Sequence, residues 1–253
     1  MTAIFVSRVE PQILGEPGLA DRYVELLDES ERRRYARYVF DEHRLEYLAG
    51  CVMAKRRIAE LSRVQPGEVR FRRDSWGRPH VAEPDRCSRY HFSISHTKGC
   101  VVSAVSESSN IGVDVERTDR APAHLPVSES CFASTELSDL GVRDGADLSG
   151  RFVQYWTLKE AYSKAVGRGL SLPFNGVVFS ISDTADPQVT FDGVDDDSRC
   201  WVFKVFQVGQ RHVMSLAFPS SPRVPLKFSR WHPAADVFVD EPLPDRRLCE
   251  ATG

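Results

Sequence analysis

The sequence lacks the features that identify secreted, membrane-spanning and zinc-binding proteins. None of its six cysteines stands in a C-x-x-C pair, which argues against a zinc knuckle. Charged residues follow the N-terminus with no long apolar run before them, so we expect no signal peptide, reduced thiols and a cytoplasmic location. No segment approaches the ~20 apolar residues of a membrane helix, and no membrane partner is expected.

The chain also has no large excess of charge of either sign. Its 33 Lys and Arg residues are nearly balanced by 36 Asp and Glu residues, which gives a net charge of −3. Surfaces that bind nucleic acid are usually basic, so this balance argues against a nucleic-acid partner. With 253 residues, of which 42% are hydrophobic, the chain can bury the core of one large domain or of two small ones.

The pattern of apolar residues indicates two halves with a similar order of elements. We predict a strand at residues 4–6, a long helix from Asp41 to about Val64 and a second long helix at 151–166. Strand patterns follow the helices, at residues 69–72, 91–96 and 100–105 in the first half and at residues 177–181, 188–191, 200–208 and 212–218 in the second. A polar connector at 117–126 separates the halves, and the tail from about Pro219 is expected to be partly loose. The expected fold class is α+β, with halves at 1–116 and 117–253.

The most informative stretch is residues 156–170. Four apolar residues recur at helical spacing and define one face, namely Leu158, Ala161, Tyr162 and Ala165. Lys159, Glu160 and Lys164 lie away from that face, and two glycines end the helix. Two interpretations stay open at this point. The charges form a solvated helix face with an ion pair four residues apart, or they converge on a polyanion and its metal ion.

A short strand pattern carries two further carboxylates. Val113 and Val115 face one way, while Asp114 and Glu116 leave the opposite face together. Two negative charges at this spacing repel each other unless a cation lies between them, and hard oxygen ligands suit Mg²⁺ or Mn²⁺. The alternative is an exposed acidic end of a strand.

Two stretches of the first half have side chains that suit phosphate. The segment 91–97 places Ser93 and Ser95 on one strand face and His96 at the strand end, although a structural role for His96 is the alternative. Arginines at positions 32, 33, 34, 37 and 44 make a local positive patch in a chain that is acidic overall. Guanidinium groups bind phosphate with two hydrogen bonds, but a solvated helix face would show the same residues.

Four stretches together resemble motifs of the 4′-phosphopantetheinyl transferases of the surfactin-synthetase-activating type. The two signature motifs are Gly112-Val113-Asp114-Val115-Glu116 and Trp156-Thr157-Leu158-Lys159-Glu160-Ala161, the second followed by Lys164 and by Gly167-x-Gly169-Leu170. The stretches Gly77-Arg78-Pro79 and Phe92-Ser93-Ile94-Ser95-His96 resemble two upstream motifs, with arginine where the family has lysine in Gly-Lys-Pro. The resemblance runs from roughly Arg32 to Pro173 and is weak after that.

The resemblance implies a fold and a reaction. The fold is a monomeric pseudo-dimer of two similar halves, each a long helix packed on a small antiparallel sheet, with coenzyme A in the cleft between them. The reaction moves the 4′-phosphopantetheine arm of coenzyme A to a serine of an apo carrier protein, requires Mg²⁺ and releases adenosine 3′,5′-bisphosphate. Carrier proteins of polyketide, non-ribosomal peptide and fatty-acid synthases are the implied partners, with secondary-metabolite synthases favoured.

The resemblance also assigns roles to individual residues. Asp114, Glu116 and Glu160 are the implied ligands of Mg²⁺, for which Mn²⁺ could substitute. Glu160 is in addition the candidate general base, directly or through a metal-bound water, so that Asp114, Glu160 and Lys164 form the implied catalytic set. The implied contacts of the coenzyme are Arg44, Arg78, Ser95, His96, Lys159 and Lys164, with Arg32 as a further candidate. Two alternatives remain: a non-catalytic protein that binds phosphate or nucleic acid, and an inactive relative that docks carrier proteins.

Overall fold

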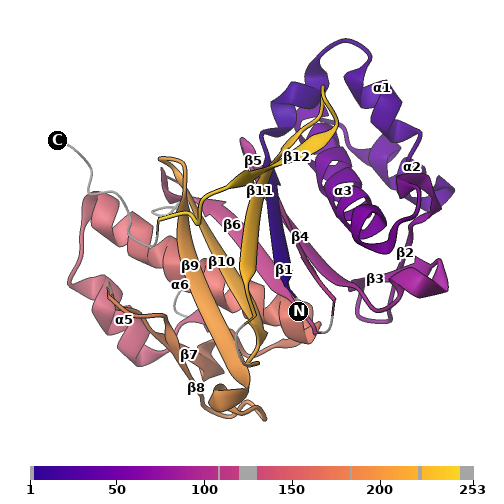
Figure 1. Ribbon diagram of the computed structural model, residues 1–253. Coiled ribbons are helices and arrows are strands. Elements are labelled where there is room, and N and C mark those ends of the chain that lie inside the picture. Colours follow the sequence, from indigo (N-terminus) through magenta and orange to yellow (C-terminus); the bar gives the residue numbers. More distant parts are fainter. Residues whose placement is uncertain (1–2, 108, 120–129, 183, 222–223, 246–253) are drawn as a thin grey trace. The chain divides into compact units, whose positions relative to one another are not determined.

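The computed structural model describes residues 3–107, 109–119, 130–182, 184–221 and 224–245. The chain divides into two compact units (Figure 1). Unit 1 consists of Met1–Ile111 and Pro222–Leu243, and unit 2 consists of Gly112–Ser221 and Pro244–Gly253. Each unit is therefore assembled from two separate segments of the chain.

Unit 1 is built on a mixed sheet of five strands. The strands are β1 (Ile4–Val9), β4 (His91–Thr97), β5 (Cys100–Ser106), β11 (Leu226–His232) and β12 (Val237–Glu241), in the order β12-β11-β1-β5-β4. β1 and β11 are parallel, and the other neighbours are antiparallel. The α-helices among the described residues of this unit are α1 (Leu19–Val24), α2 (Glu29–Arg37) and α3 (Asp41–Ser62), and α3 packs on β4 and β5. A hairpin of β2 (Arg70–Arg73) and β3 (Pro79–Glu83) completes the unit.

Unit 2 is built on an antiparallel sheet of three strands. These are β6 (Gly112–Arg117), β10 (His212–Pro219) and β9 (Trp201–Val208), with β10 in the centre. The long helix α6 (Gly145–Val166) packs on β6 and β10, and the shorter α5 (Ser134–Gly141) packs against α6. A second pair of antiparallel strands, β7 (Val177–Ser180) and β8 (Gln188–Phe191), lies beside this core.

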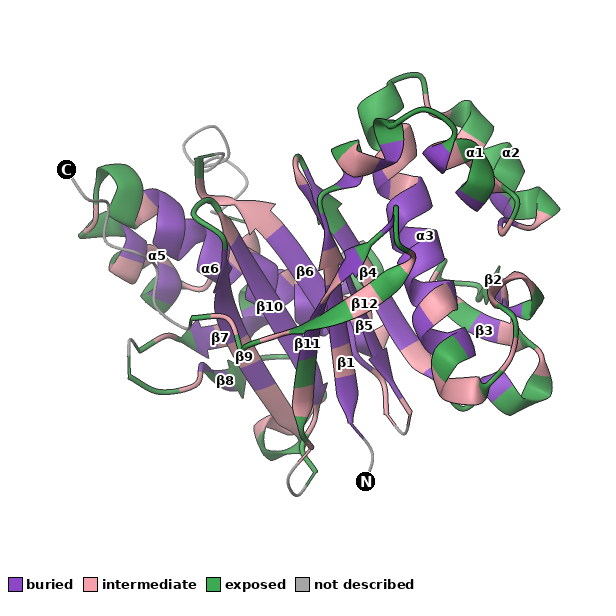
Figure 2. Ribbon diagram, turned by 45° about the horizontal axis from the view of Figure 1, so that its top comes forward, coloured by how far each residue is buried: buried purple, intermediate pink, exposed green. Residues whose placement is uncertain are grey.

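Both long helices have 22 residues and bury an apolar face against their sheets (Figure 2). The face predicted for α6 is confirmed, because Leu158, Ala161, Tyr162 and Ala165 are all at most 1% exposed. The helix ends at Gly167, whose φ of 77° is a left-handed conformation that side chains disfavour. Within the described residues, no helix is both long enough and apolar enough to cross a bilayer.

The structure confirms the α+β fold class, with one long helix on a small sheet in each unit. The tail from about Pro219 was expected to be partly loose, and this is wrong for residues 226–241, where β11 and β12 lie, whereas residues 246–253 lie outside the described residues. Trp231 is fully buried there and contacts Tyr23 edge-to-face, with ring centroids 5.0 Å apart. Apolar burial and pairing with β1 therefore hold this segment in the sheet of unit 1.

The structure also draws the boundaries differently from the sequence. Gly112–Arg117 belongs to unit 2 because it pairs with β10 over its whole length, which moves the division from residue 116 to residue 111. The second long helix begins at Gly145, six residues before Arg151. Most of the connector predicted at 117–126 lies outside the described residues.

Candidate active site

Strand β6 and helix α6 are in backbone contact at Gly112. A Cβ atom on this residue would lie 1.8 Å from the carbonyl oxygen of Ala161 and 2.7 Å from the backbone nitrogen of Ala165. Because side chains alternate along a strand, Asp114 and Glu116 leave β6 on the same face as Gly112. This face meets α6, so the absence of a side chain at position 112 allows both carboxylates to approach the helix.

Asp114 forms an ion pair with Lys164 across this contact. Its Oδ1 lies 2.6 Å from Lys164 Nζ, and the same ammonium donates to the carbonyl oxygen of Val113 at 3.3 Å. The carboxylate is 6% exposed, whereas the lysine side chain is 31% exposed. Lys164 therefore pairs with a buried carboxylate while its own side chain stays partly exposed to solvent.

Glu160 belongs to the same cluster, one helical turn before Lys164. Burial, and then the negative charge of Asp114, raise the pKa of Glu160 to about 7. Glu116 raises this pKa further, and the ammonium of Lys164 opposes the shift. The four side chains therefore form one interacting group, which we call the acidic cluster: Asp114, Glu116, Glu160 and Lys164.

The acidic cluster has the carboxylate groups that a Mg²⁺ site needs, but these groups are not arranged around a common point. Across the described part of the chain, no three His, Cys, Asp or Glu side chains converge closely enough to hold a metal ion. Carboxylate oxygens are the ligands that Mg²⁺ prefers, and after burial it is the negative charge of Asp114, with that of Glu116, that raises the pKa of Glu160. A divalent cation among them would relieve this repulsion, so the donor set fits such an ion.

Lys159 lies outside the acidic cluster, contrary to its expected contact with pyrophosphate. Its side chain is fully buried, and its ammonium lies 2.8 Å from Glu136 Oε2, which is also fully buried. It donates in addition to the carbonyl oxygens of Phe174, at 2.7 Å, and of Val177. Burial lowers the pKa of Lys159, and Glu136 opposes this shift. These contacts direct the ammonium into the core of unit 2 and away from any solvent-borne phosphate.

Arg78 is one of the coenzyme contacts predicted in unit 1. Its Nη2 donates to Asn110 Oδ1 at 2.9 Å, and burial lowers the pKa of its guanidinium. Burial, and then the positive charge of Arg78, also lower the pKa of His91. Arg78 is therefore held by the residue that directly precedes Ile111 and the Gly112 motif.

His96 and Ser95 lie next to each other on β4 but differ in exposure. The His96 side chain is 40% exposed, and its Nδ1 lies 3.1 Å from Oε2 of Glu46, a carboxylate of α3 that is 4% exposed. Glu46 thereby orients the ring and leaves Nε2 as the nitrogen turned away from it. Ser95 is buried in the sheet.

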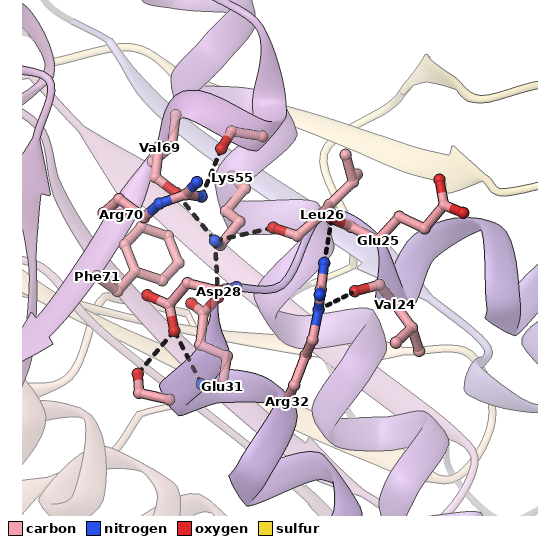
Figure 3. A network of polar contacts seen from close by, with 12 residues as sticks. Val24, Glu25, Leu26, Asp28, Glu31, Arg32, Lys55, Val69, Arg70 and Phe71 are labelled. Atoms are coloured by element: carbon pink, nitrogen blue, oxygen red, sulfur yellow. Dashed lines mark hydrogen bonds and ion pairs between the residues drawn. The ribbon is translucent and has the colours of Figure 1, made fainter.

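The two arginines predicted from the basic stretch make local contacts. Arg44 lies in the first turn of α3 and donates to Asp41 Oδ1 at 3.0 Å and to the carbonyl oxygen of Tyr38 at 2.8 Å. Arg32 donates to the carbonyl oxygens of Val24 and Glu25 at the end of α1 (Figure 3). Arg32 therefore satisfies a helix terminus, and this geometry gives no support to its use as a phosphate contact.

Comparison with known protein families shows the class of enzyme. The model of the 4′-phosphopantetheinyl transferase superfamily matches residues 110–217, and the model described as 4′-phosphopantetheinyl transferase, N-terminal, matches residues 20–108. The chain belongs to the 4′-phosphopantetheinyl transferase superfamily. This confirms the family expected from the four motifs and the enzyme class that goes with it.

Individual relatives agree with the family models. The chain is 30% identical over 205 residues to the 4′-phosphopantetheinyl transferase Sfp of Bacillus subtilis (strain 168), which covers 80% of this chain and 87% of that protein. It is 31% identical over 202 residues to a phosphopantetheinyl transferase of Thraustochytrium sp., which covers 75% of this chain and 68% of the relative. Among solved structures, a holo-(acyl-carrier-protein) synthase from Bacillus anthracis in complex with CoA (3′,5′-ADP) covers 44% of this chain and 96% of its own, with a TM-score of 0.39 and 20% identity.

Proposed function

We propose that this protein transfers the 4′-phosphopantetheine arm of coenzyme A to a serine hydroxyl of an apo carrier protein. The serine oxygen forms a bond to the phosphorus atom that carries the arm, the serine proton is removed, and adenosine 3′,5′-bisphosphate leaves. The acidic cluster supports this proposal most directly, because it sets a carboxylate with a pKa of about 7 beside an ammonium group in a chain of this family.

Glu160 is the group best suited to accept the serine proton. A general base works best when its pKa lies near the operating pH, and in the metal-free protein burial with the charge of Asp114 gives Glu160 a pKa of about 7. Lys164 reaches solvent from the same cluster, and its ammonium can stabilise the negative charge of the pyrophosphate. Asp114 holds that ammonium in place through the 2.6 Å ion pair.

Asp114, Glu116 and Glu160 would hold the Mg²⁺ ion, with Mn²⁺ as a substitute. When bound, the ion neutralises charge on the pyrophosphate and on the leaving bisphosphate. A cation held there would offset the repulsion among the three carboxylates. Mg²⁺ should therefore raise the thermal midpoint of the protein, and Asp114→Asn should abolish that increase. The matched control is Asp197→Asn, since Asp197 pairs only with the exposed Arg199 among described residues.

Arg78, His96, Ser95 and Arg44 remain proposed contacts of the coenzyme. All four belong to unit 1, whereas Lys164 belongs to unit 2, and the placement of coenzyme A between the halves stays a prediction. Arg78 and His96 have the better support, because Asn110 and Glu46 orient them without consuming all their donors. We further propose a monomeric, cytoplasmic protein that serves carrier proteins of polyketide, non-ribosomal peptide or fatty-acid synthases, with secondary-metabolite synthases favoured.

The test of the reaction is intact-protein mass spectrometry of an apo acyl carrier protein. The carrier is incubated with this protein, coenzyme A and Mg²⁺, and a second sample contains EDTA. We expect the carrier to gain one phosphopantetheine, and EDTA to prevent the gain. No gain on carriers from all three synthase classes, despite measurable binding of coenzyme A, would instead identify an inactive relative that docks carrier proteins.

A further inference from the structure

The two long helices each carry a fully buried lysine at the same position. Lys55 lies fourteen residues after Asp41, the first residue of α3, and Lys159 lies fourteen residues after Gly145, the first residue of α6. Both side chains are 0% exposed. Lysine is almost never fully buried unless it is paired, so each ammonium must have specific partners.

Lys55 has three partners in unit 1 (Figure 3). Its Nζ lies 2.7 Å from Glu31 Oε2 and donates to the carbonyl oxygens of Leu26, at 3.1 Å, and of Val69, at 2.9 Å. Glu31 is the third residue of α2, and its carboxylate also accepts the backbone N–H of Asp28 that precedes this helix. The lysine of α3 is thus joined to a helix start and to the residue before β2.

Lys159 repeats this arrangement in unit 2. Its partners are Glu136 at 2.8 Å and the carbonyl oxygens of Phe174 and Val177. Glu136 is the third residue of α5, and its carboxylate accepts the backbone N–H of Ala133 that precedes this helix, also at 2.8 Å. In both units the ammonium therefore joins the long helix to the start of a preceding short helix and to a backbone carbonyl at the beginning of a following strand, Val69 just before β2 and Val177 as the first residue of β7.

Aromatic rings extend the correspondence. Lys55 Nζ lies 5.3 Å from the ring centroid of Phe71, two residues after Val69. Lys159 Nζ lies 5.9 Å from the ring centroid of Phe179, two residues after Val177. The same set of a lysine, a glutamate, a carbonyl oxygen and a phenylalanine thus occurs twice in one chain.

An ammonium group has three N–H donors, and in each unit three acceptors take them. We infer that Lys159 is a positioning residue of the transferase: through Glu136 it fixes α6, so that the next residue along the helix, Glu160, is presented to Asp114. Lys159 does not contact the coenzyme. Lys55 fixes α3 through Glu31 in the same way. No residue of the acidic cluster lies next to Lys55 on α3. The expected effect of Lys159 on transfer rests on the proposed function, whereas its burial and its pairing with Glu136 do not.

Amine labelling of the unaltered protein tests the burial without a variant. The native protein is treated briefly with an acetylating reagent, with and without coenzyme A, and modified lysines are identified by peptide mass spectrometry. We expect Lys164 to be acetylated in the free protein and Lys159 to stay unmodified in both samples. Acetylation of Lys159 in the free protein that coenzyme A suppresses would overturn the inference, whether or not transfer to carriers is detected.

Paired substitutions test the positioning role. Lys159→Met alone leaves the Glu136 carboxylate buried without its cation, and a displaced α6 should lower kcat by about 100-fold with little change in the KM for coenzyme A. The double variant Lys159→Met/Glu136→Gln removes both charges, but its single amide oxygen replaces two carboxylate oxygens that accept the N–H groups of Ala133 and of Phe179. We expect it to fold and to recover part of kcat, well above Lys159→Met, with an unchanged KM for coenzyme A.

The matched control is Lys55→Met with Lys55→Met/Glu31→Gln in unit 1. Lys55→Met should lower the thermal midpoint as Lys159→Met does, but should leave kcat of the folded protein unchanged, because no residue of the acidic cluster adjoins Lys55. A raised KM for coenzyme A in the double variant at position 159 would show that Lys159 binds the coenzyme. A kcat that stays as low as in Lys159→Met would show that Glu136 is not the partner through which it acts. Either result contradicts the inference, while wild-type transfer in the same assay shows independently that the proposed function holds.

Discussion

Gly112 and Ala161 are in backbone contact, because a Cβ atom at position 112 would lie 1.8 Å from the Ala161 carbonyl oxygen. This contact sets the distance between β6 and α6 in unit 2. Asp114 is two residues beyond Gly112 on the strand, and Glu160 directly precedes Ala161 on the helix. The separation of their carboxylates therefore depends on the absence of a side chain at position 112.

Gly112→Ala should destabilise unit 2 and separate the acidic cluster. An extra methyl group in a packed site costs about 1–3 kcal/mol, and here it meets backbone that cannot move aside as a side chain can. Thermal or urea unfolding measures the cost, and transfer activity should fall with it. The control is Gly141→Ala at the end of α5, where a Cβ atom meets nothing within 4 Å and should be neutral or stabilising. Equal stability of the two variants would contradict the close contact.

The raised pKa of Glu160 predicts how stability depends on pH. Its folded-state pKa of about 7 lies above the ordinary value of 4.5, so between these values the unfolded chain loses this proton first. Ionisation of Glu160 therefore lowers the stability of the metal-free protein as pH rises from about 4.5 to about 7, with no further change above that. Glu160→Gln should match wild type near pH 4 and exceed it in stability above pH 7. Urea unfolding in EDTA at a series of pH values checks this, and parallel curves for the two proteins would refute it.

Neighbouring charges should move the titration of Glu160 in opposite directions. Lys164→Met removes the cation that lowers the pKa of Glu160, so this pKa should rise above about 7. Asp114→Asn removes the largest repelling charge, so the pKa should fall towards 4.5. The carboxyl ¹³C chemical shift of Glu160, followed through a pH titration in EDTA, measures both changes. Shifts of the same sign in the two variants would disprove the proposed coupling.

Trp231 should be essential for the stability of unit 1 although it lies in the proline-rich tail. The side chain is 0% exposed, and truncation of a buried aromatic residue costs about 3–5 kcal/mol. Trp231→Ala should therefore lower the unfolding midpoint strongly. Trp76→Ala is the matched control, because Trp76 is 70% exposed and its loss should have little effect. A small effect at position 231 would mean that β11 contributes little to the sheet.

Local patterns in the sequence predicted the parts of the site that depend on a single element. The period of Leu158, Ala161 and Ala165 identified the buried face of α6, and alternation placed Asp114 and Glu116 on one face of β6. The family motifs then indicated that β6 and α6 contribute to one site, which the spacing of residues within each element cannot show. The sequence could have indicated the role of Gly112, since a glycine in a strand often marks a place where another backbone comes close.

The parts that were missed depend on contacts between distant segments. Lys159 lies off the apolar face by helical spacing, and only the positions of Glu136 and of the Phe174 and Val177 carbonyl oxygens show that its ammonium points into the core. The tail was misjudged because β11 is held by parallel pairing with β1, more than 200 residues earlier in the chain. The amino-acid composition of the proline-rich segment contains no information about pairing with a strand so distant in the sequence.

The most direct test of the central claim compares transfer by three proteins under identical conditions. Wild type, Glu160→Gln and Glu116→Gln are incubated with an apo carrier protein, coenzyme A and Mg²⁺, and the carrier is followed by intact-protein mass spectrometry while coenzyme A binding is measured by calorimetry. We predict that wild type converts the carrier, that Glu160→Gln binds coenzyme A but converts at least about 100-fold more slowly, and that Glu116→Gln is intermediate. Wild-type rates in a folded Glu160→Gln variant would contradict the assignment of the acidic cluster as the active site.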